Sequence, residues 1–124
     1  MPPPPKVNLA DKLGGLAEPW VPAIVGELNG QYLKVVRFEG EYVWHQHAGE
    51  DECFLLIDGK MRICFRDGDV EMAPGELCIV PRGVEHKPVA EPVAQVVLFE
   101  PAATRNTGDL DHAYTIEPGD LPRA

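Results

Sequence analysis

Three of the four histidines in this chain lie at spacings that suit a metal ion. His45 and His47 form a His-x-His pair, Glu52 follows in the next apolar run, and His86 comes after a distant Pro-x-Gly turn. On a strand, His-x-His places both imidazoles on one face, because side chains alternate with a period of two. The carboxylate of Glu52 can return to that face, and a barrel can bring a distant histidine to meet it.

Three neutral imidazoles and one carboxylate form a borderline donor set. Such a set suits a divalent transition metal such as Fe, Mn, Ni or Zn, and it disfavours the oxygen-preferring Ca²⁺ and Mg²⁺. Glu50 is an alternative to Glu52, but it falls in the expected turn, where a carboxylate would face water. His112 stands in a polar tail without a partner, so we interpret it as an exposed or interface residue. The ligands we predict are therefore His45, His47, Glu52 and His86.

The elements that must position these residues are short strands. From residue 21 onward, runs rich in Val, Ile, Leu, Phe and Tyr are broken at close intervals by Gly, Pro, Asn and Asp. Many short strands at this spacing predict an all-β fold, either a closed barrel or a two-sheet jelly roll, because an open sheet would leave long unpaired edges. The strands are expected near 21–28, 31–38, 41–47, 52–58, 60–66, 69–72, 76–80, 84–89 and 93–100.

The chain divides into three parts. Residues 1–20 predict an N-terminal tail with a short helical turn that ends at Gly14-Gly15, and residues 21–100 predict the barrel. Residues 101–124 are a polar C-terminal tail with one short apolar run at 113–116. This run predicts either a late strand or a crossing to a neighbouring subunit.

Composition excludes several kinds of partner. The chain has 124 residues, with 11 Lys and Arg against 20 Asp and Glu, a formal charge of −9. This charge repels nucleic acid and anionic membrane surfaces. No apolar stretch approaches the roughly 20 residues that a membrane span needs, and the start lacks a signal-peptide pattern, so we expect a cytoplasmic protein. The three cysteines lie singly in apolar runs, as expected for core residues in a reducing compartment.

Two segments resemble the two short motifs of the cupin superfamily, and together they cover most of the expected barrel. The first motif matches His45, His47, Glu52 and Gly59, and the second matches Gly75, Pro81, Gly83 and His86. Two departures leave the ligands in place: the spacer from Gly40 to His45 is one residue short, and Ala90 stands where Asn is often found. The resemblance implies a small cupin β-barrel (a double-stranded jelly roll), commonly dimeric, with one metal ion bound by the four matching side chains.

The resemblance also implies a class of function. Open metal positions would favour a metalloenzyme acting on a small oxygenated organic molecule, of the dioxygenase type with iron or nickel, or of the isomerase or lyase type with manganese or zinc. The alternative is a non-catalytic module that binds or senses a sugar or carboxylate. Ala48 replaces an arginine typical of phosphosugar isomerases, which disfavours that activity. The apolar edge at 21–25 predicts a homodimer.

Overall fold

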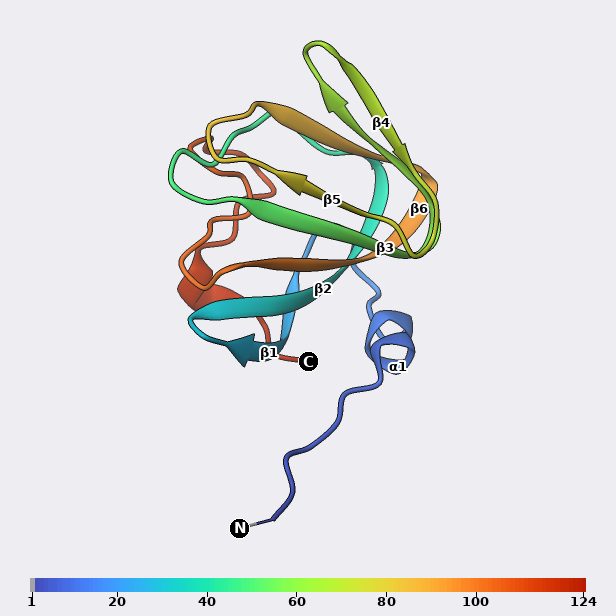
Figure 1. The fold of residues 1–124 in the computed structure, drawn as a ribbon, viewed down its shortest axis with the longest axis vertical. Helices are drawn as coiled ribbons and strands as arrows, with labels where there is room; N and C mark the ends of the chain where they lie inside the picture. Colours follow the sequence, from blue (N-terminus) through green and yellow to red (C-terminus); the bar gives the residue numbers. More distant parts are fainter. Residues whose placement is uncertain (1) are drawn as a thin grey trace.

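The computed structural model describes residues 2–124, and its regular secondary structure is almost entirely antiparallel strand, which confirms the all-β prediction (Figure 1). Within these residues, one short helix precedes the strands and a single 3-10 turn follows them. The elements are α1 (Leu9–Gly14), β1 (Ala23–Leu28), β2 (Gln31–Glu41), β3 (Glu52–Phe65), β4 (Gly68–Met72), β5 (Leu77–Val80), β6 (His86–Pro101) and η1 (Pro118–Asp120).

The two longest strands, β3 and β6, form one ladder that folds back on itself. The sheet order is β1-β2-β6-β3-β4, with β5 paired to β3. Residues 53–58 of β3 pair with 95–99 of β6, and residues 61–65 pair with 86–90, with register shifts between the two halves. The expected strands 52–58 and 60–66 are therefore two halves of β3. At the bend, Gly59 has φ +92°, and a Cβ there would lie 2.3 Å from the Val93 carbonyl oxygen, so the position requires glycine.

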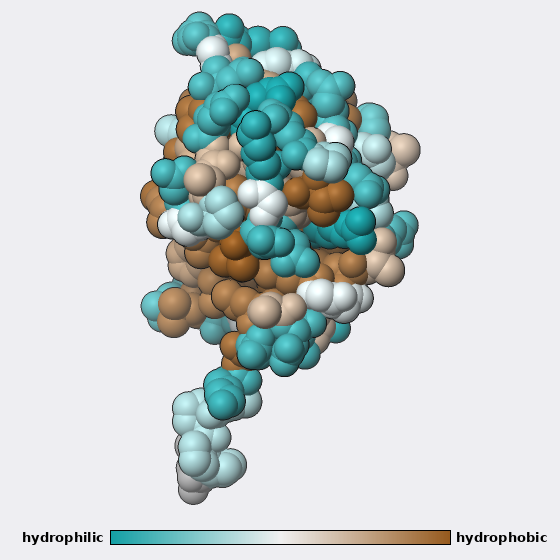
Figure 2. All heavy atoms as spheres, turned by 90° about the vertical axis from the view of Figure 1, so that its right-hand side faces the viewer, coloured by the Kyte–Doolittle hydropathy of each residue, from teal (hydrophilic) through white to brown (hydrophobic). Residues whose placement is uncertain are grey.

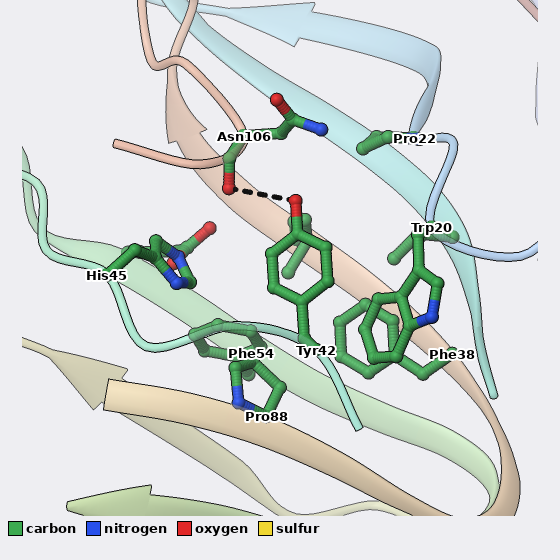
Figure 3. A pocket seen from close by; sticks show the side chains of 11 residues that line it. Trp20, Pro22, Phe38, Tyr42, His45, Phe54, Pro88 and Asn106 are labelled. Atoms are coloured by element: carbon green, nitrogen blue, oxygen red, sulfur yellow. Dashed lines mark hydrogen bonds between the residues drawn. The ribbon is translucent and has the colours of Figure 1, made fainter. Parts of the chain in front are cut away.

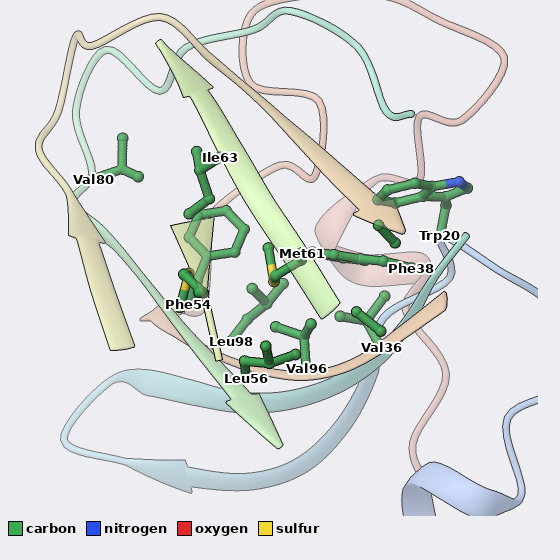
Figure 4. Close-up of a cluster of buried hydrophobic side chains, with 13 residues drawn as sticks. Trp20, Val36, Phe38, Phe54, Leu56, Met61, Ile63, Val80, Val96 and Leu98 are labelled. Atoms are coloured by element: carbon green, nitrogen blue, oxygen red, sulfur yellow. The ribbon is translucent and has the colours of Figure 1, made fainter. Parts of the chain in front are cut away.

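The main core fills the space between the two halves of the folded ladder (Figure 4). Its side chains come from alternate positions of the long strands, because only every second residue faces inward. Phe54 and Leu56 of β3 and Val96 of β6 are 2% exposed or less. Figure 4 shows them converging with Met61 and Ile63 from the second half of β3.

A smaller cluster lies on the outer face of β2 and β6, where α1 packs. Leu13 of α1 is buried together with Ala23, Val35 and Val97. The helix begins after Asn8, whose side chain accepts a hydrogen bond from the Asp11 backbone N–H at 3.0 Å. Hydrophobic side chains gather on this side of the molecule above the extended N-terminal tail (Figure 2). No helix within residues 2–124 is long and apolar enough to cross a membrane.

The C-terminal segment does not form the late strand expected at 113–116. Residues 113–116 form a turn and irregular chain rather than a strand. Residues beyond them cover the edge of β1: Ile24 donates to the Pro122 carbonyl at 2.9 Å, and Ala124 donates to the Ile24 carbonyl at 3.0 Å. The edge at 21–25, expected to pair with a second subunit, is therefore partly covered by residues 122–124 of the same chain.

Candidate metal centre

Four predicted side chains meet inside one end of the barrel. One potential ligand atom from each of His45, His47, Glu52 and His86 lies within 4.8 Å of the others, so this group could hold a metal ion. All four residues are buried, at 0–5% exposure. The histidines and the glutamate that the spacing predicted to converge do converge.

Two of the four residues begin long strands, and the other two lie on the loop between β2 and β3. Glu52 is the first residue of β3 and His86 is the first residue of β6. The bend in the ladder brings these two strand starts together, although in the pairing register they lie far apart. His45 joins His86 through an isolated bridge, with backbone hydrogen bonds in both directions at 3.0 and 2.9 Å.

The strand expected at 41–47 is wrong beyond Glu41, where β2 ends. Tyr42 still donates to the Pro88 carbonyl, but Pro88 has no N–H to return a hydrogen bond, so the regular ladder stops. The residues that follow nevertheless alternate in direction. His45 and His47 are buried, whereas Gln46 between them is exposed.

Backbone carbonyls orient two of the three imidazole rings. His45 Nδ1 lies 2.9 Å from the Val43 carbonyl oxygen, and His86 Nδ1 lies 2.9 Å from the Val84 carbonyl oxygen. Because a carbonyl only accepts, Nδ1 carries the proton in both rings. The lone pair of a neutral ring is then on Nε2, the atom available to a metal ion.

The centre contains buried polar atoms that the protein itself leaves without a hydrogen bond. His47 Nε2 and His86 Nε2 each lie 3.3 Å from Glu52 Oε1. None of these three atoms has a partner with hydrogen-bond geometry among the described residues. Buried polar atoms are rarely left unpaired. A bound cation would satisfy all three at once, so the donor set fits a metal ion.

The electrostatics favour an ionised carboxylate beside neutral imidazole. Burial and the neighbouring His86 lower the pKa of His45 to about 4. Burial opposes ionisation of Glu52, but the close approach of His47 and His86 outweighs it and holds the pKa of Glu52 well below its usual range. Burial also opposes protonation of His47, yet Glu52 raises the pKa of that ring. A divalent cation would compete with this proton for the same negative charge.

Behind the centre lies a buried ion pair that sequence reasoning missed. Lys34 of β2 and Glu100 of β6 are each 1% exposed, with Nζ 2.8 Å from Oε1. Burial and the negative charge of Glu52 raise the pKa of Glu100. The alternation of side chains along each strand could have indicated this pair. Lys34 lies two residues from Val36, and Glu100 lies two residues from Leu98, so each faces the same side of the sheet as that apolar residue.

The C-terminal segment packs directly onto the loop that carries two of the histidines. The Asp109 N–H donates to the Gln46 carbonyl at 3.3 Å, and Gly108 approaches the same carbonyl so closely that an added Cβ would lie 1.9 Å from its oxygen. Tyr42 O–H donates to the Asn106 carbonyl at 3.4 Å. A segment expected to be a tail thus forms part of the site. His112, by contrast, is exposed, as predicted.

A narrow pocket lies beside the centre, with His45 and Glu52 in its wall. Figure 3 shows His45 and the aromatic side chains that line it. Aromatic side chains dominate the rest of the wall. Trp20 stacks on Phe38 and on Tyr42, each with ring centroids 4.5 Å apart. Phe54 also lines this pocket. The candidate ligands His45 and Glu52 therefore border a narrow, largely apolar pocket.

Comparisons with known proteins agree with this architecture. A family model described as "Cupin domain" matches residues 35–100. "Uncharacterized protein YdbB" of Bacillus subtilis (strain 168) is 30% identical over 64 residues, which are 51% of this chain and 57% of that protein. The match thus spans little more than half of that relative.

Solved structures extend the similarity over a larger part of the chain. A cupin-2 domain containing protein from Shewanella frigidimarina NCIMB 400 is 39% identical with a TM-score of 0.75, covering 77% of this chain and 93% of that one. Protein NMB1881 from Neisseria meningitidis is 32% identical with a TM-score of 0.71, covering 78% of this chain and 99% of that one. These similarities confirm the fold that the two motifs predicted.

Proposed function

The chain belongs to the cupin domain family, and from that premise we propose that it binds one divalent transition-metal ion through His45, His47, Glu52 and His86. The observation that carries the proposal is the set of three buried, unpaired atoms on His47, Glu52 and His86. Three imidazole nitrogens and one carboxylate oxygen suit Fe, Mn, Ni or Zn. The same donor set is poorly suited to Ca²⁺ or Mg²⁺.

The proposed activity is that of a metalloenzyme acting on a small oxygenated organic molecule, of the dioxygenase, isomerase or lyase type. A bound metal with free coordination positions supplies Lewis-acid polarisation of a ligand oxygen or, for a redox-active metal, activation of dioxygen. The chain's own residues fix the site: the Val43 and Val84 carbonyls orient two rings. Trp20 and Tyr42 contribute to the largely apolar wall of the pocket beside the centre.

Metal content of variants tests the centre. His47→Ala and Glu52→Ala are each expected to lower bound metal sharply in protein purified without chelator, because each removes one of four ligands. His112→Ala is the matched control, since His112 is exposed and lies outside the group. Circular dichroism checks that the barrel remains folded. Wild-type stoichiometry in the two ligand variants would contradict the proposed site.

Substrate turnover then separates catalysis from binding. Metal-loaded protein is screened with candidate substrates, with and without dioxygen, and products are followed by mass spectrometry. Dioxygen-dependent or isomerised products that disappear in Glu52→Ala would support the metalloenzyme. Tight, saturable binding without any product would instead assign the non-catalytic binding or sensing module.

We also infer a homodimer, now through a sheet face rather than the edge at 21–25. On the outer face of the sheet, Ile79, Cys53 and Phe99 form one row across β5, β3 and β6. Leu77 and Ile79 are each 59% exposed. A contiguous apolar row of this kind favours contact with a second copy. Light scattering of wild type against Ile79→Lys tests the inference, and a wild-type monomer would refute it.

A further inference from the structure

Three buried charged side chains lie in a row across the sheet beside the candidate metal centre. Strands β2, β6 and β3 are neighbours in this order (Figure 1). Lys34 of β2 and Glu100 of β6 are each 1% exposed, and Glu52 at the start of β3 is 3% exposed. Charged side chains are almost never buried this completely unless they are paired. We therefore expect each member of the row to have a partner.

The register of β3 against β6 places the two glutamates of this row opposite each other. Cys53 pairs with Phe99, so Glu52 and Glu100 are the next facing positions toward this end of the ladder. Both side chains are buried, which places them on the inner face of the sheet. Side chains that face each other in this way have Cβ atoms about 4.5–5.5 Å apart. The two carboxyl groups are therefore within reach of each other.

The two oxygen atoms of Glu100 have different surroundings. Oε1 accepts a hydrogen bond from Lys34 Nζ at 2.8 Å. Oε2 is buried and has no hydrogen-bond partner with the required geometry among residues 2–124. Buried polar atoms are rarely left unpaired. The carboxyl group of Glu52, which stands opposite, is the polar group in position to satisfy this oxygen.

The candidate ligands differ in how the protein orients them. Backbone carbonyls fix the rings of His45 and His86. Glu52 Oε1 lies 3.3 Å from His47 Nε2 and from His86 Nε2, yet it accepts no hydrogen bond from any described residue. Groups that hydrogen-bond to metal ligands orient them and raise the affinity for the metal ion. Glu52 is therefore the ligand whose orientation most needs a further contact.

We propose that Glu100 is a positioning residue for the metal centre, held by Lys34 and hydrogen-bonded to the Glu52 carboxyl group through one shared proton. This contact keeps Glu52 Oε1 directed toward the histidines, so that the carboxylate is in place before a metal ion arrives. Lys34 supplies the positive charge that compensates the two carboxyl groups. The inference rests on the metal centre proposed above and adds to it the pair that holds its one carboxylate ligand.

A double variant separates this role from a purely structural one. Lys34→Met/Glu100→Leu replaces the pair with apolar side chains of similar size, so the barrel is expected to remain stable. It also removes the hydrogen bond to Glu52, and we expect its affinity for Co²⁺ to fall about 10–100-fold. Loss of the Lys34 charge alone would favour a nearby cation, so it cannot explain weaker binding.

The matched control is Glu100→Gln, which keeps both contacts. Its amide oxygen accepts from Lys34, and its amide N–H donates to Glu52. We expect this variant to bind Co²⁺ with the affinity of wild type. Competition against a coloured metal indicator measures the affinity, and urea unfolding of the metal-free proteins measures stability. The visible spectrum of bound Co²⁺, which reports the geometry of its ligands, should change only in the double variant.

The outcomes separate the positioning role from the metal centre. A stable double variant with the Co²⁺ affinity and spectrum of wild type would overturn the positioning role and leave the metal centre standing. Wild-type protein that binds no Co²⁺ would overturn the metal centre, and the inference with it. A Glu100→Gln protein whose Co²⁺ affinity falls about tenfold or more would also overturn the positioning role. That comparison decides if the double variant does not fold.

Discussion

Replacing Gly108 with alanine tests whether the C-terminal segment holds the metal-binding loop in position. Gly108 has φ +59°, and an added Cβ would lie 1.9 Å from the Gln46 carbonyl oxygen and 2.7 Å from its carbon. Real Cβ atoms essentially never come within 3.0 Å of such neighbours. Gln46 stands between His45 and His47, so any retreat of its carbonyl moves the backbone that carries both rings.

The magnitude has two parts. A left-handed conformation costs an alanine about 1–2 kcal/mol relative to glycine, which lowers the free energy of unfolding. The contact must also open from 1.9 Å to at least 3.0 Å, a shift of more than 1 Å in a backbone segment between two candidate ligands. Disturbing groups that orient metal ligands typically weakens metal affinity about 10–100-fold. We expect a loss of that size for Gly108→Ala.

A competition titration against a coloured metal indicator measures this affinity. Two alanine variants serve as controls. Gly75→Ala adds left-handed strain at φ +88° with no atom within 4 Å, and Gly119→Ala adds neither strain nor contact. Gly75→Ala is expected to lose stability but keep wild-type affinity, and Gly119→Ala to keep both. A folded Gly108→Ala protein that binds metal as tightly as wild type would refute the reasoning.

Two further predictions concern buried charge. Lys34→Met is expected to lower the free energy of unfolding in urea by about 1–3 kcal/mol, because it leaves the Glu100 carboxyl buried without its hydrogen-bond partner. Lys34→Met/Glu100→Leu should recover most of that loss, and a single variant as stable as wild type would contradict the pair's importance. In metal-free protein, the pKa of His45 is lowered from 6.5 to about 4. Between these values the unfolded chain binds more protons, so stability should fall by about 3 kcal/mol as the pH drops from about 6.5 to about 4. The pKa of His47 is raised above 6.5, so its contribution to stability changes at pH values above this range. Urea unfolding of His45→Gln at several pH values should show a flatter dependence, and an unchanged slope would count against this assignment.

The four residues of the candidate centre were predictable because their spacing in the sequence indicates that their side chains converge. His-x-His, the following Glu52 and the Pro-x-Gly turn before His86 are local patterns, and each matches a motif. The strand expected at 41–47 was wrong because its end depends on Pro88, which lies far along the chain and opposite Tyr42. Local pattern cannot show which residue stands across a ladder.

Other parts of the site were not predictable for the same reason. Lys34 and Glu100 are 66 residues apart, and only the pairing of β2 with β6 makes them neighbours. The tail was expected to be peripheral because it is polar and lacks periodicity. Its contact with Gln46 depends on Gly108, a single glycine that looks like an ordinary loop residue in the sequence.

The folded ladder of β3 and β6 couples the metal centre to the transient opening of strands throughout the barrel. Glu52 begins β3 and His86 begins β6, and both strands continue from the centre into the main core at Met61 and Val96. A metal ion held between these two residues would stabilise only the closed ladder. Metal binding should therefore slow amide hydrogen exchange along both strands, including amides in the second half of β3, on the far side of the bend at Gly59.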